Sequence, residues 1–264
     1  MKHLFLLISA FALMSGALAQ SSFVITNPDN EEATLSVFLP AEDIATGRAV
    51  VCCPGGGYQH VCMDYEGTDW APYFNDMGIA YAVLKYRMPK GNREIPLSDA
   101  DWAMTTLREN AEQWNINTAD VGIMGFSAGG HLASTIATHG SDEVRPNFQI
   151  LFYPVISMDQ FLGHQGSSEN FLGDDVADPE LIEEYSNMNK VNANTTPPAI
   201  IFLAQDDHVV PPLNNGIPYY IALSKNHIKA ALHCYTHGGH GWRPNRFPFY
   251  DEMLTTLTNW LNTF

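Results

Sequence analysis

The stretch VGIMGFSAGGHLA, residues 121–133, carries a strand pattern, a tight turn and the start of a helix in succession. Val121–Phe126 is a short apolar run typical of a buried strand, and a helix is expected just after Ser127. Gly125 and Gly129 flank the serine in a G-x-S-x-G pattern, because a side chain at either position would clash in so tight a turn. This context lifts the hydroxyl above the end of a sheet and directs helix N–H groups toward it. We therefore predict that Ser127 is a nucleophile.

On both sides of this turn, apolar strand-like runs alternate with helical patterns. The expected strands are Ser22–Thr26, Leu35–Leu39, Ala49–Cys53, Ala80–Tyr86, Val121–Phe126, Phe148–Pro154, Ala199–Ala204 and Ala230–Tyr235. The expected helices are Thr68–Met77, a helix capped by Ser98, a helix after Ser127, and Phe249–Phe264. Strands that are apolar on both faces and separated by helices predict an α/β fold, with a mostly parallel central sheet flanked by helices on both faces. The first two strands have no helix between them and are expected to form an antiparallel edge.

One long segment, Ser157–Pro198, breaks this alternation. It is rich in Gly, Asn, Asp and Ser, and its only helical pattern is a short piece near Pro179–Tyr185. Loops of this length are usually functional or disordered. We expect a rim or lid-like insertion at about 157–198, within a single domain that spans residues 20–264.

The N-terminus has the three parts of a secretory signal peptide. Lys2 gives a short basic start, Leu4–Leu13 is almost continuously apolar, and small residues stand at Ala17 and Ala19. The apolar run is too short for a stable membrane anchor. We expect residues 1–19 to be cleaved and the enzyme to be secreted or periplasmic. No later segment is long, apolar and uncharged, so no transmembrane helix is expected.

Charge and cysteine content narrow the range of partners. The chain has 264 residues and a formal net charge of −16, which argues against nucleic acid or an anionic membrane as a partner. The four cysteines are Cys52, Cys53, Cys62 and Cys234, and none stands in a CxxC or Cys/His ligand spacing. No metal site is therefore predicted. We expect buried thiols, with a Cys53–Cys62 disulfide as the alternative.

A serine nucleophile needs a base and a group that orients the base. At this kind of turn the order along the chain is serine, then an acid, then a histidine. Asp206 and Asp207 follow the expected strand Ala199–Ala204, and we predict Asp206 as the acid, with Asp207 as the alternative. His240 lies between glycines after the last expected strand and is the predicted base; its rivals are His237 and His208.

Ester hydrolysis through a serine also needs N–H donors for the developing oxyanion. One donor should be the backbone of Ala128, directly after the nucleophile. The others should come from the glycine-rich run PGGGY at 54–58, because glycine lets the backbone approach a substrate closely. We predict the N–H groups of Gly56, Gly57 and Ala128 as the oxyanion hole.

Six segments together carry a family resemblance. They are PGGGYQHVCMDYEG at 54–67, GFSAGGHLA at 125–133, GSSENFLG at 166–173, TPP at 196–198, AQDDHVVP at 204–211 and GGHGW at 238–242. The chain resembles the α/β-hydrolase superfamily and, within it, bacterial acetyl xylan esterases and related carbohydrate esterases. Pro54 stands where the related lipase motif has His.

The resemblance implies an α/β-hydrolase fold and the hydrolysis of acetyl or other short-chain acyl esters, on plant polysaccharides or oligosaccharides such as acetylated xylan. It implies no cofactor, and it supports Asp206 and His240. A general short-chain carboxylesterase or lipase, a peptidase, and an inactive binding protein are the alternatives. From their places beside the catalytic segments, Tyr58, Asp64 and Trp242 are candidate substrate contacts.

Overall fold

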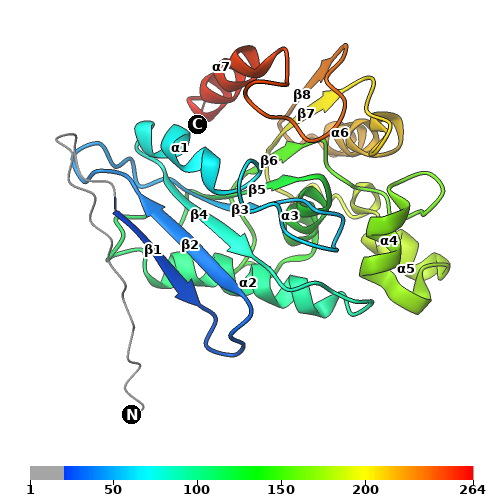
Figure 1. Cartoon of the computed structure of the whole chain (residues 1–264), viewed down its shortest axis with the longest axis horizontal. Helices are drawn as coiled ribbons and strands as arrows, with labels where there is room; N and C mark the ends of the chain where they lie inside the picture. Colours follow the sequence, from blue (N-terminus) through cyan, green and yellow to red (C-terminus); the bar gives the residue numbers. More distant parts are fainter. Residues whose placement is uncertain (1–20, 264) are drawn as a thin grey trace.

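A central sheet of eight strands organises the chain, in the order β1-β2-β4-β3-β5-β6-β7-β8 (Figure 1). The structure, a computed structural model, describes residues 21–263. The signal peptide predicted for residues 1–19 lies outside them. The strands are β1 Ser21–Thr26, β2 Thr34–Leu39, β3 Ala49–Cys53, β4 Ala80–Lys85, β5 Val121–Phe126, β6 Gln149–Phe152, β7 Ala199–Ala204 and β8 Ala230–Tyr235.

The sheet is antiparallel at one edge and parallel over the rest. β1 pairs with β2 and β2 with β4 in antiparallel register, whereas every pairing from β4 through β3 to β8 is parallel. The first two strands follow each other through a short turn, which permits only antiparallel pairing, while the later strands are joined by crossovers. The predicted antiparallel edge and mostly parallel sheet are confirmed.

Helices cover both faces of the sheet. The α-helices are α1 Ala71–Asp76, α2 Glu94–Glu109, α3 Ser127–His139, α4 Gln165–Leu172, α5 Pro179–Tyr185, α6 Gly216–Lys225 and α7 Tyr250–Leu261. Buried residues of α2, α3 and α6 pack on one face, and those of α1 and α7 pack on the other. Val51 and Cys53 face the first core and Val50 and Cys52 face the second, which is why β3 is apolar at every position.

Three helices differ from the sequence predictions. One of them, α6 Gly216–Lys225, was not among the expected helices. α2 begins at Glu94, so Ser98 lies inside it and donates to the carbonyl of Ile95 instead of capping the helix. Pro96 belongs to the first turn, where its missing N–H group costs nothing. The insertion between β6 and β7 contains the expected α5 and also α4, which was not predicted because its capping residue, His164, is an uncommon one.

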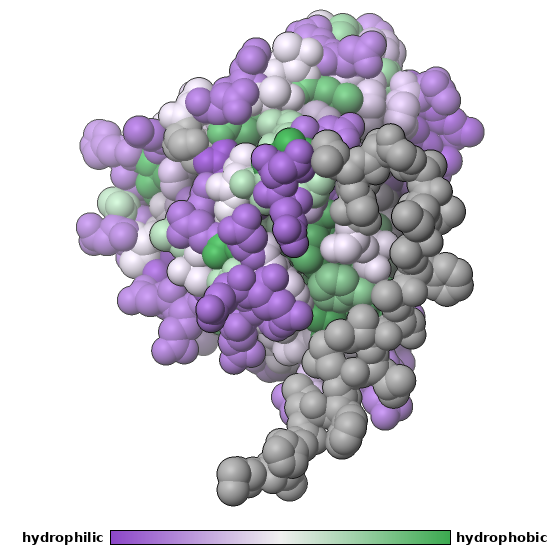
Figure 2. All heavy atoms as spheres, turned by 90° about the vertical axis from the view of Figure 1, so that its left-hand side faces the viewer, coloured by the Kyte–Doolittle hydropathy of each residue, from purple (hydrophilic) through white to green (hydrophobic). Residues whose placement is uncertain are grey.

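The thiols are all free. The alternative Cys53–Cys62 disulfide is therefore wrong. Cys52 and Cys53 are buried as predicted, but Cys62 is half-buried and Cys234 is exposed. Hydrophilic side chains are spread over the face seen from the β1 side, with small apolar areas between them (Figure 2). Among residues 21–263, no helix combines the length and the apolar character needed to cross a membrane.

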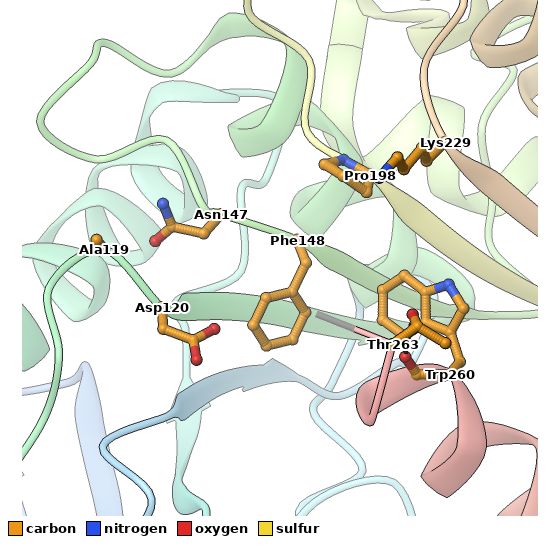
Figure 3. A pocket seen from close by; sticks show the side chains of 8 residues that line it. All are labelled: Ala119, Asp120, Asn147, Phe148, Pro198, Lys229, Trp260 and Thr263. Carbon is orange, nitrogen blue, oxygen red and sulfur yellow. Dashed lines mark hydrogen bonds between the residues drawn. The ribbon is translucent and has the colours of Figure 1, made fainter.

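A pocket of about 430 Å³ lies at the amino ends of the parallel strands (Figure 3). It is lined by Ala119, Asp120, Asn147, Phe148, Pro198, Lys229, Trp260 and Thr263. In sheets of this type ligands bind outside the carboxyl ends of the strands. Ser127 directly follows the carboxyl end of β5, so this pocket, at the amino ends of the strands, lies at the opposite edge of the sheet from Ser127.

Candidate active site

Ser127 occupies the sharp turn between β5 and α3. Its φ is 51°, in the left-handed region that a non-glycine residue adopts only when its surroundings enforce it. The enforcement is steric: a Cβ atom at Gly125 would collide with the carbonyl of Gly129, and one at Gly129 would collide with the carbonyl of Cys53. The two flanking glycines thus allow the turn to pack against the sheet, and the predicted strand–turn–helix is present.

Ser127, His240 and Asp207 form a continuous hydrogen-bonded chain. The Nε2 atom of His240 lies 2.9 Å from Oγ of Ser127, and its Nδ1 atom lies 2.6 Å from Oδ2 of Asp207. The carboxylate of Asp207 accepts the Nδ1–H group, so Nε2 carries the lone pair that faces the serine hydroxyl. Asp207 is 3% exposed, and its Oδ1 atom also accepts the N–H groups of Val209 and Val210.

The prediction of Asp206 as the acid is wrong, and the alternative, Asp207, holds that position. Oδ1 of Asp206 accepts the N–H group of Gly239 at 2.8 Å, a bond that also lowers the pKa of the carboxyl. Asp206 therefore fixes the backbone of the loop that carries His240, while its neighbour orients the imidazole. Adjacent residues after a strand point in different directions, and the sequence alone does not say which one faces the histidine.

The two rival histidines make no hydrogen bond to Ser127. Nδ1 of His237 pairs with the hydroxyl of Thr236, and its ring packs against Phe249. His208 is exposed to solvent. The structure thus brings only His240, of the three candidates, to Ser127.

The glycine-rich loop after β3 lies beside Ser127. A Cβ atom at Gly55 would lie 3.0 Å from Cβ of Ser127, so the two backbones approach closely. Gly56 and Gly57 have φ values of 132° and 64°. No hydrogen bond within residues 21–263 uses the N–H group of either residue. Ala128 is the second residue of α3, and N–H groups in the first turn of a helix have no partner inside it.

Glu66 fixes the start of this loop, a role that the sequence did not reveal. Its side chain is buried, with Oε2 accepting the N–H group of Gly55 and Oε1 accepting the hydroxyl of Tyr153, both at 2.9 Å. Burial raises the pKa of the carboxyl, and the Tyr153 hydroxyl, the Gly55 N–H group and the charge of His240 oppose that rise. The ring of Tyr153 packs edge-on against His240, with centroids 4.6 Å apart. One carboxylate thus supports both the glycine loop and the histidine.

Tyr58 and Trp242 are not substrate contacts, which corrects two predictions. Tyr58 is 1% exposed and its hydroxyl pairs with Nδ1 of His131 at 2.9 Å. Trp242 is 5% exposed, stacks on Phe247 at 3.9 Å and donates to the carbonyl of Gly239. Both aromatic residues pack under the catalytic loops and hold them in shape.

Asp64 differs from these two residues because its side chain is exposed. Its backbone carbonyl accepts the N–H groups of Gly67 and Asp69, which shapes the end of the loop. Within the part of the chain that the structure describes, its carboxylate makes no hydrogen bond. A contact between Asp64 and a sugar stays a prediction.

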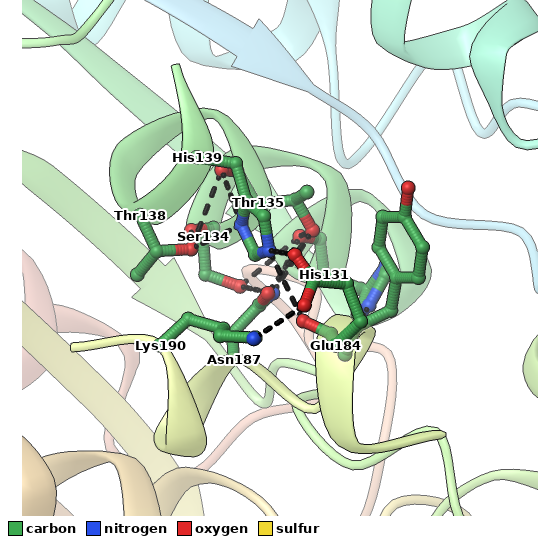
Figure 4. A network of polar contacts seen from close by, with 9 residues as sticks. His131, Ser134, Thr135, Thr138, His139, Glu184, Asn187 and Lys190 are labelled. Atoms are coloured by element: carbon green, nitrogen blue, oxygen red, sulfur yellow. Dashed lines mark hydrogen bonds and ion pairs between the residues drawn. The ribbon is translucent and has the colours of Figure 1, made fainter. Parts of the chain in front are cut away.

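A buried polar network ties α3 to the insertion (Figure 4). Nε2 of His131 lies 2.9 Å from the carbonyl of Tyr185, at the end of α5, while Nδ1 faces Tyr58. The amide of Asn187 donates to Ser134 at 2.7 Å. Because His131 is fully buried, its pKa is lowered to about 4, and the neutral ring bridges two partners. The network holds the insertion against the helix that begins with the nucleophile.

Metal chemistry has no evident ligand set here. Among residues 21–263, no group of three or more His, Cys, Asp or Glu side chains is arranged to hold a metal ion. The reactive groups of the site are instead a hydroxyl, an imidazole, a carboxylate and backbone N–H groups. Such a set performs acyl transfer through a serine.

Comparison with known proteins agrees with this architecture. The family model BD-FAE matches residues 35–215. The chain belongs to the BD-FAE family. An acetylxylan esterase of Xylanibacter ruminicola is 44% identical over 254 residues, which cover 96% of this chain. This chain spans 52% of the length of that relative.

Two solved structures place the fold. An acetyl ester-xyloside bifunctional hydrolase from Caldicellulosiruptor lactoaceticus has 32% identity and a TM-score of 0.80, with 90% of this chain and 91% of the other covered. An alpha/beta hydrolase enzyme from a Medee basin deep-sea metagenome library has 27% identity and a TM-score of 0.71, with 93% and 100% covered. The predicted α/β-hydrolase fold is confirmed.

Proposed function

We propose that this BD-FAE family chain is a serine esterase that hydrolyses acetyl and other short-chain esters of saccharides, using Ser127, His240 and Asp207. The observation that carries the proposal is the unbroken chain of hydrogen bonds from Asp207 through His240 to a strained Ser127. It lies beside a glycine loop in which the N–H groups of Gly56 and Gly57 make no hydrogen bond within residues 21–263.

In the first half-reaction, Ser127 Oγ attacks the ester carbonyl carbon and His240 Nε2 takes the hydroxyl proton. The carbonyl π electrons move to oxygen, and the N–H groups of Gly56, Gly57 and Ala128 stabilise that oxyanion. Asp207 stabilises the imidazolium by accepting its Nδ1–H group. The bond from carbon to the alcohol oxygen then breaks, and His240 gives its proton to the departing alcohol.

In the second half-reaction, water attacks the acyl-serine carbonyl while His240 takes one of its protons. The same three N–H groups hold the second oxyanion. The bond to Ser127 Oγ breaks, the proton returns to Oγ, and the carboxylic acid leaves. Each proton passes through one nitrogen, Nε2, which is why the tautomer set by Asp207 matters.

The substrate class follows from the relatives. The curated relative named acetylxylan esterase and the solved acetyl ester-xyloside hydrolase both indicate acetyl groups on xylose-containing saccharides. Acetylated xylan or its oligosaccharides is therefore the substrate that we propose for this chain. Polymeric xylan does not enter a cell, so this substrate agrees with export by the predicted signal peptide at residues 1–19.

A general short-chain carboxylesterase would use the same catalytic parts, and it is the second candidate. An ethyl acetate hydrolase of Pseudomonas putida is 27% identical over 141 residues, which cover 51% of this chain. The alcohol half of the substrate separates the two candidates, because acetate is common to both.

The test is acetate release from acetylated xylooligosaccharide, run beside hydrolysis of 4-nitrophenyl acetate and 4-nitrophenyl butyrate. Ser127→Ala should lower kcat on all of them by about 10⁴- to 10⁶-fold, as in other serine hydrolases. A fluorophosphonate probe should label the unaltered chain and not the variant. Near-normal turnover by Ser127→Ala would refute the mechanism, and activity confined to the butyrate would refute the acetyl esterase.

A further inference from the structure

The imidazole of His164 lies at the edge of the catalytic site and belongs to none of the catalytic steps. A Cβ atom at Gly57 would lie 3.5 Å from Cε1 of His164, and from no other atom within 4 Å. The side chain of Asn170, on α4, donates to the carbonyl of Gly57 at 2.9 Å. The insertion is therefore hydrogen-bonded to the glycine loop through Asn170, and the half-buried imidazole of His164 lies beside Gly57, a proposed oxyanion donor.

The hydrogen bonds of His164 determine which of its nitrogens is free. Nδ1 accepts the N–H group of Ser167 at 3.1 Å and pairs with the Ser167 hydroxyl at 2.8 Å, so that His164 caps α4. Burial and the nearby His240 lower the pKa of the imidazole, which keeps the ring neutral with its proton on Nε2. Nε2 makes no hydrogen bond within residues 21–263, so it offers an unused N–H donor.

Four exposed apolar side chains lie close in sequence to His164 or to Asp207. Phe161, Leu162, Val209 and Leu213 are 86%, 53%, 49% and 74% exposed, and we call them the outer platform. Only three other large apolar side chains of residues 21–263 are comparably exposed, so four of the seven lie on two segments that Asn214 joins. Phe161 and Leu162 lie between β6 and α4, on the segment that leads to His164, and Val209 and Leu213 lie between β7 and α6, on the segment that leads from Asp207.

The two loops are fixed before any ligand binds. The amide of Asn214 donates to the carbonyl of Leu162 at 2.8 Å and joins them. The carboxylate of Asp159 accepts the N–H groups of Phe161 and Leu162, at 2.8 and 3.2 Å. Gly163 closes the turn by donating to the carbonyl of Asp159 at 2.7 Å. A held loop that exposes a phenyl ring to water indicates a binding role.

We infer that His164 and the outer platform form the subsite for the saccharide that carries the ester, with the sugar ring next to the acetylated one lying on Phe161. Pyranose rings have apolar C–H faces that pack on aromatic rings, and hydroxyl groups that accept a hydrogen bond from an N–H group. A long acyl chain would gain nothing from the N–H group of His164. The inference rests on the proposed function, because it assigns the alcohol half of that ester.

The test compares two acetates that differ only in the alcohol: acetylated xylooligosaccharide and 4-nitrophenyl acetate. Phe161→Ala should lower the ratio of the two kcat/KM values about tenfold, through KM, whereas Phe161→Trp should keep it. His164→Asn retains an N-cap and loses the Nε2 donor, and it should lower the same ratio. Val24→Ser, on the exposed edge strand β1, is the matched control and should leave kcat/KM unchanged for both acetates.

A binding measurement separates failure of the subsite from failure of the proposed function. In the Ser127→Ala variant, calorimetry should detect binding of deacetylated xylooligosaccharide. Adding Phe161→Ala should raise the dissociation constant of that saccharide about tenfold. Fluorophosphonate labelling of the unaltered chain reports on the catalytic proposal independently. The subsite is refuted if no saccharide binds, if the ratio is unchanged, or if the variants alter the butyrate-to-acetate preference instead.

Discussion

Exchanging one oxygen for an amide nitrogen at Asp207 should disable the histidine without disturbing the fold. In Asp207→Asn the amide oxygen can keep the bonds to the N–H groups of Val209 and Val210, both 2.9 Å long in the parent. The amide NH₂ group then faces Nδ1 of His240, where Oδ2 now lies at 2.6 Å. Nδ1 of His240 must then accept a hydrogen bond from the amide, so the ring proton moves to Nε2. Nε2 then has no lone pair with which to take the proton of Ser127. We expect kcat to fall about 10⁴-fold, or about 5 kcal/mol of transition-state stabilisation.

Asp206→Asn is the matched control, one residue away. Its amide oxygen can still accept the N–H group of Gly239, so the histidine loop should keep its position and kcat should change less than tenfold. Steady-state hydrolysis of 4-nitrophenyl acetate measures both variants, and circular dichroism confirms that both are folded. Equal losses in the two variants, or the larger loss in Asp206→Asn, would show that the assignment of Asp207 is wrong.

Three further predictions concern stability. His131 has an ordinary pKa of 6.5 that burial lowers to about 4, so the unfolded chain binds a proton more readily and stability falls as the pH drops from 6.5 toward 4. When the free energy of unfolding is measured with urea, it should fall by roughly 2 kcal/mol more in the parent than in His131→Gln between pH 7 and pH 4.5. An equal fall in both proteins would contradict this prediction. Gly129→Ala should fail to fold or lose activity, because the new methyl group collides with the carbonyls of Cys53 and Pro54. Gly166→Ala, whose methyl group makes only an ordinary 3.5 Å contact inside α4, should raise the melting temperature slightly.

Local patterns predicted most of the fold. Ala49–Cys53, Val121–Phe126 and Ala199–Ala204 are strands at the predicted bounds, because each is a short apolar run that is buried at every position. Ala230–Tyr235 also has the predicted bounds, although it is a partly exposed edge strand. The helix in the insertion, α4, escaped prediction since its cap is His164 and its length is two turns. The start of α2 was misplaced because a serine–aspartate pattern inside the helix imitates a cap.

Local patterns likewise predicted some residues of the candidate site and missed others. Ser127, with glycines on both sides, follows from sequence alone because the strained turn requires those residue types at those positions. His240 follows from the order of elements, since the last strand brings its loop to the carboxyl edge of the sheet. Contacts between distant segments have no local signature, and Glu66, which joins the glycine loop to Tyr153, was therefore not recognised.

By itself, the sequence determined the fold class and singled out Ser127 and His240, which we propose as nucleophile and base, because each depends on a short pattern that forces one backbone geometry. Only the tertiary structure decided between Asp206 and Asp207, since two adjacent carboxylates differ solely in the direction that the loop turns them. It also placed Tyr58 and Trp242 in the interior and Phe161 on the surface. The burial of a single aromatic residue in a loop depends on the whole packed molecule, and local spacing does not encode it.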